Sequence, residues 1–190
     1  MFCTFLIPTI NRSTLKRSID SVYAQTDPDW GIVVAWNGLV DVPKAFKTDD
    51  PRIKHVTSGG KFLGHDNVGA QTRNLGLAIA EGEWIANLDD DDTVTPDYVA
   101  CLKKEAEGFD LIHFRTLYPD PASDTRPSRG QYAFRADTVC NSHAFRLAFV
   151  REHNITYIDD KNEDWVTFKA MLDAGARAKM SDYATYKFRF

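Results

Sequence analysis

The sequence predicts an α/β protein with a mostly parallel central sheet and helices on both of its faces. Short apolar runs of strand length alternate with longer segments whose apolar residues recur at helical spacing. Strands of a parallel sheet are buried on both faces, so they read as continuous apolar runs. The chain has 190 residues, the length of one domain, and neither a repeat nor a linker interrupts it. We therefore expect residues 1–190 to form a single domain.

The first expected βαβ unit begins the chain. Phe2–Ile7 is an apolar run that suits a buried strand. A helix follows, with Ser13 positioned to cap its N-terminus and Pro28 beyond its end. Its buried stripe is formed by Leu15, Ile19, Val22 and Tyr23. The next apolar run, Gly31–Trp36, is expected to be the second strand.

The alternation continues with a weaker strand at Arg52–Thr57 and a helix from about Val68 to Gly82. Glu83–Leu88 is expected to be the fourth strand, and it ends directly in four aspartates, Asp89–Asp92. In an open parallel sheet ligands bind at the carboxyl ends of the strands. These carboxylates therefore fall where a functional site would be built.

The second half of the chain is expected to begin with a helix at Pro96–Ala106 and a strand at Phe109–Arg115. The proline-rich stretch Tyr118–Gly130 is expected to be a loop that moves over the site. The remaining expected elements are a short strand at 132–134, a helix at 142–152, a helix at 164–174 and a β-like stretch from 177 to the end.

Composition excludes several classes of protein. With 23 basic and 27 acidic side chains, the formal net charge is −4, so we expect no general binding of nucleic acid. The three cysteines are far apart and form no CxxC pair, which favours reduced thiols in a cytosol-like compartment. No run approaches the roughly 18 apolar residues of a membrane span, and the start does not resemble a signal peptide. We expect a cytoplasmic protein with no transmembrane segment, which meets a membrane only through a partner.

The four adjacent aspartates, Asp89–Asp92, allow two interpretations. Charge runs are usually solvated, so one is a polar loop that caps the next helix. However, adjacent carboxylates repel one another unless a cation neutralises them, and oxygen-only ligands suit Mg²⁺ or Mn²⁺. An EF-hand is excluded, because Val94 and Ala100 stand where that loop needs glycine and glutamate. We expect a site for a divalent metal and phosphate groups.

Five motifs follow one another along the chain: FLIPTINR (Phe5–Arg12), AQTDPDW (Ala24–Trp30), VVAWNG (Val33–Gly38), GAQTRNLGLAIAEGEWIANLDDDD with TPDYV (Gly69–Val99), and NEDW (Asn162–Trp165). In this order they resemble the motifs of family 2 glycosyltransferases with the GT-A fold. The resemblance is close over about residues 3–99 and returns at 159–175. It implies one GT-A domain, in which residues 1–100 bind a nucleoside diphosphate sugar of the UDP or GDP type and residues 101–190 bind the acceptor.

The same resemblance implies an inverting transfer of the sugar to a hydroxyl of a glycan, protein or lipid-linked acceptor, assisted by Mn²⁺ or Mg²⁺. Asp91 is implied as the primary metal ligand, with Asp89 toward the ribose or the metal-bound waters. Arg73 is expected to face the donor, and a surface salt bridge is the alternative. Further donor contacts are expected from Pro8, Thr9, Asn11, Arg12 and Asp90.

The sequence departs from the family at the end of the second strand. An aspartate usually binds the base or ribose there, whereas this chain has Trp36 followed by Asn37. An indole can stack on a base, and an amide offers both a donor and an acceptor, so both residues are expected to contact the donor. The identity of the base stays open.

Glu163 and Asp164 open the expected helix at 164–174. Acidic residues at a helix N-terminus also compensate the helix dipole, which is the structural alternative. The resemblance makes Asp164 the general base that takes the proton of the acceptor hydroxyl, with Glu163 orienting the acceptor or exchanging roles with it. Trp165 and His143 are expected acceptor contacts, and a structural role is the alternative for the histidine.

Two other functions fit parts of the pattern. A nucleotidyltransferase that makes nucleotide sugars has a similar sheet, but it needs a glycine-rich loop after the first strand, and Pro8–Ser13 contains no glycine. A non-catalytic module that binds sugar nucleotides or carbohydrate also shares the fold. The presence of both Asp91 and Asp164 argues against that module.

Overall fold

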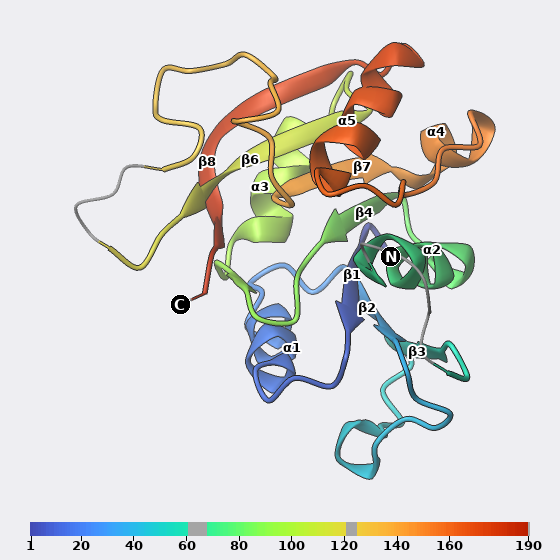
Figure 1. The fold of residues 1–190 in the computed structure, drawn as a ribbon. Coiled ribbons are helices and arrows are strands. Elements are labelled where there is room, and N and C mark those ends of the chain that lie inside the picture. Colours follow the sequence, from blue (N-terminus) through green and yellow to red (C-terminus); the bar gives the residue numbers. More distant parts are fainter. Residues whose placement is uncertain (61–67, 121–124, 190) are drawn as a thin grey trace.

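The computed structural model describes residues 1–60, 68–120 and 125–189 (Figure 1). Over these residues the chain forms an eight-stranded sheet in the order β3-β2-β1-β4-β7-β6-β8-β5. The strands are β1 (Cys3–Thr9), β2 (Trp30–Trp36), β3 (Ile53–Thr57), β4 (Trp84–Asn87), β5 (Thr93–Val94), β6 (Leu111–Leu117), β7 (His143–Arg146) and β8 (Ala178–Lys187). The helices are α1 (Leu15–Tyr23), α2 (Val68–Ile79), α3 (Tyr98–Glu105), α4 (Leu147–Glu152) and α5 (Glu163–Asp173), with a 3-10 turn at Lys44–Phe46.

The sheet is parallel in its first half and mixed in its second. β1 pairs in parallel with β2 and β4, and β2 pairs in parallel with β3. β7 runs antiparallel to β4 and β6, whereas β8 is parallel to β6 and antiparallel to β5. The predicted α/β fold with a mostly parallel sheet is confirmed.

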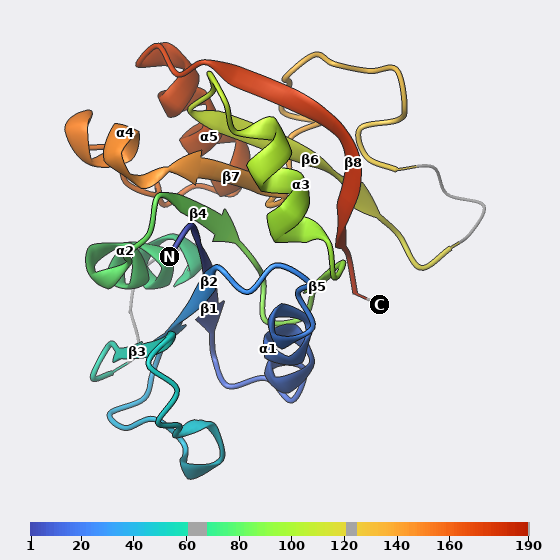
Figure 2. The same cartoon turned by 180° about the vertical axis from the view of Figure 1, so that it is seen from behind.

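Helices cover both faces of the sheet, as predicted. From behind, Figure 2 shows α1 and α3 on one face, where Ile19 and Leu102 enter the core. On the other face lie α2, α4 and α5 (Figure 1), with Leu77 and Phe168 in a second cluster of buried side chains. A helix or a sheet must bury its apolar face against another element, which explains these layers. In the described part of the chain, no helix combines the length and apolar character needed to cross a membrane.

Two predicted elements in the second half of the chain are wrong. The stretch Tyr132–Phe134 adopts no regular structure instead of a strand. Residues 142–152 were expected to be helical throughout, but His143–Arg146 form β7 and only Leu147–Glu152 form a helix. β7 fills the space between β4 and β6 and pairs with both. A strand of this length is determined by its neighbours in the sheet, which local spacing does not reveal.

The predicted mobile loop, Tyr118–Gly130, includes residues 121–124, which lie outside the described residues. Its later part is attached to the sheet, because Arg126 and Thr116 pair through two backbone hydrogen bonds of 2.8 and 3.0 Å. Buried Arg115 also donates to the carbonyl groups of Pro127 and Ser128 at 2.8 and 2.7 Å. Residues 126–128 of this loop are therefore held against β6.

Close packing of α2 on β1 positions one wall of the site. A Cβ atom at Gly76 would lie 2.3 Å from Leu6 Cδ1, so a larger residue here would have to displace the buried Leu6 side chain or move the helix away from the sheet. Leu6 pairs with Asn87, so β1 and β4 leave the sheet as neighbours at Thr9 and the aspartate run. The ends of strands β1 and β4, which precede the predicted donor and metal residues, are thereby brought together.

Candidate active site

A cavity of about 450 Å³ opens at the carboxyl ends of β1 and β4. Its walls are formed by the β1–α1 loop, α2, the loop that follows β4 and the N-terminus of α5. The predicted site residues that line it are Pro8, Thr9, Arg12, Arg73, Asp89, Asp90, Asp91, Glu163, Asp164 and Trp165. Residues predicted for the donor, the metal and the base thus share one cavity.

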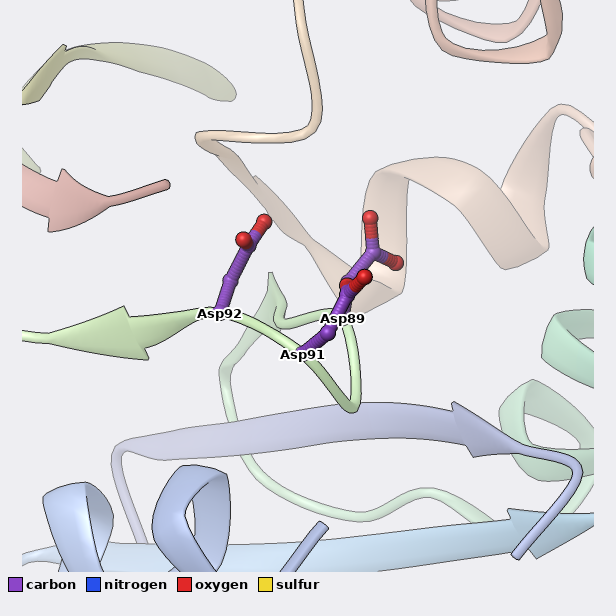
Figure 3. Close-up of side chains that lie close together, drawn as sticks. All are labelled: Asp89, Asp91 and Asp92. Carbon is purple, nitrogen blue, oxygen red and sulfur yellow. The ribbon is translucent and has the colours of Figure 1, made fainter. Parts of the chain in front are cut away.

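The acidic loop, Asp89–Asp92, folds back on itself through a hydrogen bond from the Asp92 N–H to the Asp89 carbonyl at 3.1 Å. Asp89, Asp91 and Asp92 each place a carboxylate oxygen within 4.8 Å of the others (Figure 3). Asp90 is buried against β1 instead, where the Thr9 hydroxyl donates to its carboxylate at 2.6 Å. Three of the four carboxylates are therefore available to one cation.

The donor set of this loop fits a hard divalent cation. Burial and the neighbouring Asp89 raise the pKa of Asp92 to about 6, although the Tyr186 hydroxyl donates to it at 2.7 Å. Asp91 faces two arginines, with Arg12 Nη1 at 2.9 Å and Arg189 Nε at 3.3 Å. Crowded carboxylates that need neutralising charge, with oxygen as the only ligand atom, suit Mg²⁺ or Mn²⁺.

Arg73 reaches from α2 to both sides of the cavity. Its Nη1 atom donates to Glu163 Oε1 at 2.7 Å, and its Nη2 atom donates to Asp89 Oδ1. The side chains of Arg73 and Glu163 are only 7% and 5% exposed. The alternative of a surface salt bridge is therefore wrong. Arg73 forms ion pairs with Asp89 and Glu163 at once, and we call this arrangement the buried ion bridge. It connects the acidic loop to the start of α5.

The two acidic residues that open α5 have different surroundings. Glu163 is held by Arg73, whereas the Asp164 carboxylate borders the cavity and forms no ion pair with any described residue. Burial raises the pKa of Asp164 to about 7, and the positive charge of Arg73 partly opposes that rise. A carboxyl group that titrates near neutral pH is suited to general base catalysis.

Trp36 and His143 do not reach the cavity, so the contacts predicted for them are wrong. The Trp36 side chain is fully buried, and its indole Nε1–H donates to His55 Nδ1 at 3.1 Å. No face of the ring is left for a nucleotide base. His143 is also fully buried, and its Nε2 atom lies 3.0 Å from Asn87 Nδ2. The structural alternative is the one that holds for this histidine.

Asn11 and Asn37 lie beside the cavity without lining it. The Asn11 N–H donates to Thr9 Oγ1 at 2.9 Å, and its φ of 68° turns the chain from β1 toward α1. The Asn37 N–H donates to the Thr9 carbonyl at 2.9 Å, which ties the end of β2 to the end of β1. Both residues shape the loop that carries Thr9.

Two residues of the site were missed from the sequence. Asn141 is buried and its Nδ2 atom donates to Asp89 Oδ1 at 2.7 Å, beside Arg73. Asp92 belongs to the carboxylate cluster in addition to the predicted pair. The acidic run itself was a signal for Asp92, whereas an isolated asparagine in a loop carries none.

The fold is that of the GT-A glycosyltransferases. The structure of Staphylococcus aureus TarS 1–349 in complex with UDP-GlcNAc matches with a TM-score of 0.78 and 18% identity, over 98% of this chain and 58% of that chain. The mannosyltransferase PcManGT from Pyrobaculum calidifontis, in complex with GDP-Man and Mn²⁺, matches with a TM-score of 0.67 and 17% identity, over 98% and 56%. At these identities the likeness concerns the fold alone.

Residues 4–165 match the family model described as glycosyl transferase family 2, so the chain belongs to that family. The succinoglycan biosynthesis protein ExoO of Rhizobium meliloti is 32% identical over 107 residues, which is 55% of this chain and 29% of that protein. The match thus covers less than a third of the length of this relative. The family resemblance seen in the motifs is confirmed.

Proposed function

We propose that this chain transfers a sugar from a nucleoside diphosphate donor of the UDP or GDP type to an acceptor hydroxyl, with inversion at the anomeric carbon. The observation that carries the proposal is one cavity with the acidic loop on one wall and Asp164 on another. Family membership supports the reaction class, and the UDP-GlcNAc and GDP-Man in the two similar structures support the donor class.

Asp91 and Asp89 are the proposed ligands of Mn²⁺ or Mg²⁺, with Asp92 beside them. Such an ion supplies Lewis acid stabilisation of the negative charge on the leaving diphosphate. The Mn²⁺ in the PcManGT complex supports this assignment. Arg12 and Arg189, which already face Asp91, carry further positive charge at the same place.

The β1–α1 loop is the proposed contact of the nucleotide. Pro8 and Thr9 line the cavity, and the pairing of Thr9 with buried Asp90 fixes the loop to the acidic loop. Asn11 and Asn37 act on the donor by shaping that loop. The acceptor, a glycan, protein or lipid-linked sugar, enters beside Trp165, which borders the cavity next to Asp164.

Asp164 is the proposed general base, and Glu163 is not. The Glu163 carboxylate is neutralised by Arg73 at 2.7 Å, so taking up a proton would break a buried ion pair. Asp164 has no such partner among the described residues, and burial raises its pKa to about 7. It removes the hydroxyl proton as the acceptor oxygen attacks the anomeric carbon from the face opposite the diphosphate.

The test is release of nucleoside diphosphate from UDP-GlcNAc and GDP-mannose in the presence of Mn²⁺. Asp164→Asn lowers turnover by about 10²–10⁴-fold and leaves the affinity for the donor nearly unchanged, because a base acts on the chemical step. Wild-type turnover in this variant would remove Asp164 from the mechanism. A binding module would give no turnover with any donor, and a nucleotidyltransferase would need a sugar phosphate and a nucleoside triphosphate.

A further inference from the structure

Asn74 follows Arg73 on α2 and holds a distant segment by its backbone. Its Nδ2 atom donates to the Tyr157 carbonyl at 2.8 Å, and the Tyr157 N–H donates to Asn74 Oδ1 at 2.8 Å. The Asn74 side chain thus pairs with both the backbone N–H and the backbone carbonyl of Tyr157, as a neighbouring strand would. The two residues are 83 positions apart, so the contact joins the two halves of the chain.

Tyr157 is also anchored through its side chain. Its hydroxyl donates to Asn87 Oδ1 at the end of β4, and Asn87 Nδ2 lies 3.0 Å from His143 Nε2. His143 Nδ1 in turn lies 3.0 Å from the Cys140 carbonyl. Asn87 and His143 are fully buried and Tyr157 is 4% exposed, so this series of hydrogen bonds lies in the protein interior. Buried polar groups joined in this way restrict the positions of all their members.

The segment between Tyr157 and Glu163 leads into α5, whose second residue is Asp164. Arg73 binds Glu163 at the far end of this segment, and Asn74 binds Tyr157 at its near end. Two adjacent residues of α2 therefore fix both ends of the segment that leads to the proposed base. A base must lie within hydrogen-bond reach of the proton it takes, so a small shift of this segment slows the reaction strongly.

We propose that Asn74 is a positioning residue, which sets the place of Asp164 through the backbone of Tyr157. The inference rests on the proposed role of Asp164 as the base. Asn74 itself does not line the cavity, and so it acts on the reaction only through the segment that it holds. Its loss is expected to lower turnover and to leave the donor site intact.

The experiment compares Asn74→Ala with a matched control, Gln25→Ala. Gln25 is also a buried amide that joins two segments, since its Nε2 donates to the Thr95 carbonyl at 2.7 Å and its Oε1 accepts from the Val99 N–H at 3.0 Å. Hydrogen exchange of the amides of residues 157–165 reports on the segment without any ligand. Turnover of UDP-GlcNAc and GDP-mannose with Mn²⁺ reports on the reaction.

In Asn74→Ala we expect about 10-fold faster exchange at residues 157–165 and a kcat lowered by about 10- to 100-fold, with the donor KM within about twofold of wild type. Gln25→Ala changes neither quantity by more than about twofold. Asn74→Asp keeps the acceptor for the Tyr157 N–H, so its exchange lies between Asn74→Ala and wild type. If Asn74→Ala does not fold, Asn74→Asp is used for the same two measurements.

Unchanged exchange at residues 157–165 would overturn the inference. So would faster exchange with wild-type kcat, or a loss of kcat that Gln25→Ala shares. The proposed function fails separately. If the wild type turns over neither donor, or if Asp164→Asn is fully active, the role of Asp164 is lost and the inference falls with it. Normal dependence on Asp164 with a fully active Asn74→Ala refutes the positioning role alone.

Discussion

Substituting methionine for Arg73 removes the cation of the buried ion bridge and keeps most of its apolar stem. The side chains of Arg73 and Glu163 are 7% and 5% exposed, so the carboxylate left behind stays buried but loses its arginine. Breaking a buried ion pair by removing one partner destabilises a protein by about 3–5 kcal/mol. Asp89 is 33% exposed, and its share of the bridge adds at most about 1 kcal/mol.

Urea unfolding at pH 7.5, followed by tryptophan fluorescence, measures this loss as a change in the free energy of unfolding. The double variant with Glu163→Gln also removes the buried negative charge and is expected to recover at least about half of the stability lost. A loss below about 1 kcal/mol in Arg73→Met would show that the bridge is not buried. A double variant no more stable than the single one would show that the buried Glu163 charge is not the cause.

Four further predictions concern the base, the second strand and α2. Turnover is expected to fall as the pH drops through about 7, because Asp164 then takes up a proton. A bound cation would shift the midpoint of this fall to lower pH. A rate that does not change between pH 5.5 and 8 would contradict the prediction. A raised pKa means that the folded protein favours the protonated form of Asp164. Its contribution to the free energy of unfolding is therefore fully present below the unfolded pKa of 3.8 and is lost as the pH rises through about 7. In urea melts at pH 8, Asp164→Asn is therefore more stable than the wild type. Trp36→Phe is expected to leave the affinity for UDP and GDP, measured by calorimetry, unchanged. It lowers the free energy of unfolding by about 1 kcal/mol, because the hydrogen bond to His55 is lost. A tenfold loss of affinity would instead place the indole against the nucleotide base. Gly76→Ala destabilises by about 1–3 kcal/mol, since its Cβ would lie 2.3 Å from Leu6 Cδ1, and an unchanged melting temperature would refute this contact.

The first half of the fold could be predicted because its strands are buried on both faces. Runs such as Gly31–Trp36 are continuously apolar, and the structure places β2 within one residue of that range. The position of Asp89–Asp92 followed from the same pattern, since the run directly follows such a strand. That three of these carboxylates converge while Asp90 turns toward Thr9 is visible only in the structure.

The parts that failed depend on contacts between distant segments. His143–Arg146 form a strand because β4 and β6 flank them, and the same placement buries His143 away from any substrate. Trp36 ends its strand in a pocket with Phe46 and His55, which local sequence does not show. Arg73 binds Glu163 across 90 positions, so the difference between the two carboxylates at the start of α5 emerges only in three dimensions.

The measurement that tests the donor site most directly is the thermal shift of the chain with UDP, GDP, CDP and dTDP, each with and without Mn²⁺. A ligand present at 100 times its dissociation constant stabilises the folded state by about 2.7 kcal/mol. We expect at least one nucleoside diphosphate to raise the melting temperature more with Mn²⁺ than without it, and Asp91→Asn to remove the part that depends on the metal. The absence of any shift, with every nucleotide and with Mn²⁺ present, would contradict a nucleotide-sugar site in this cavity.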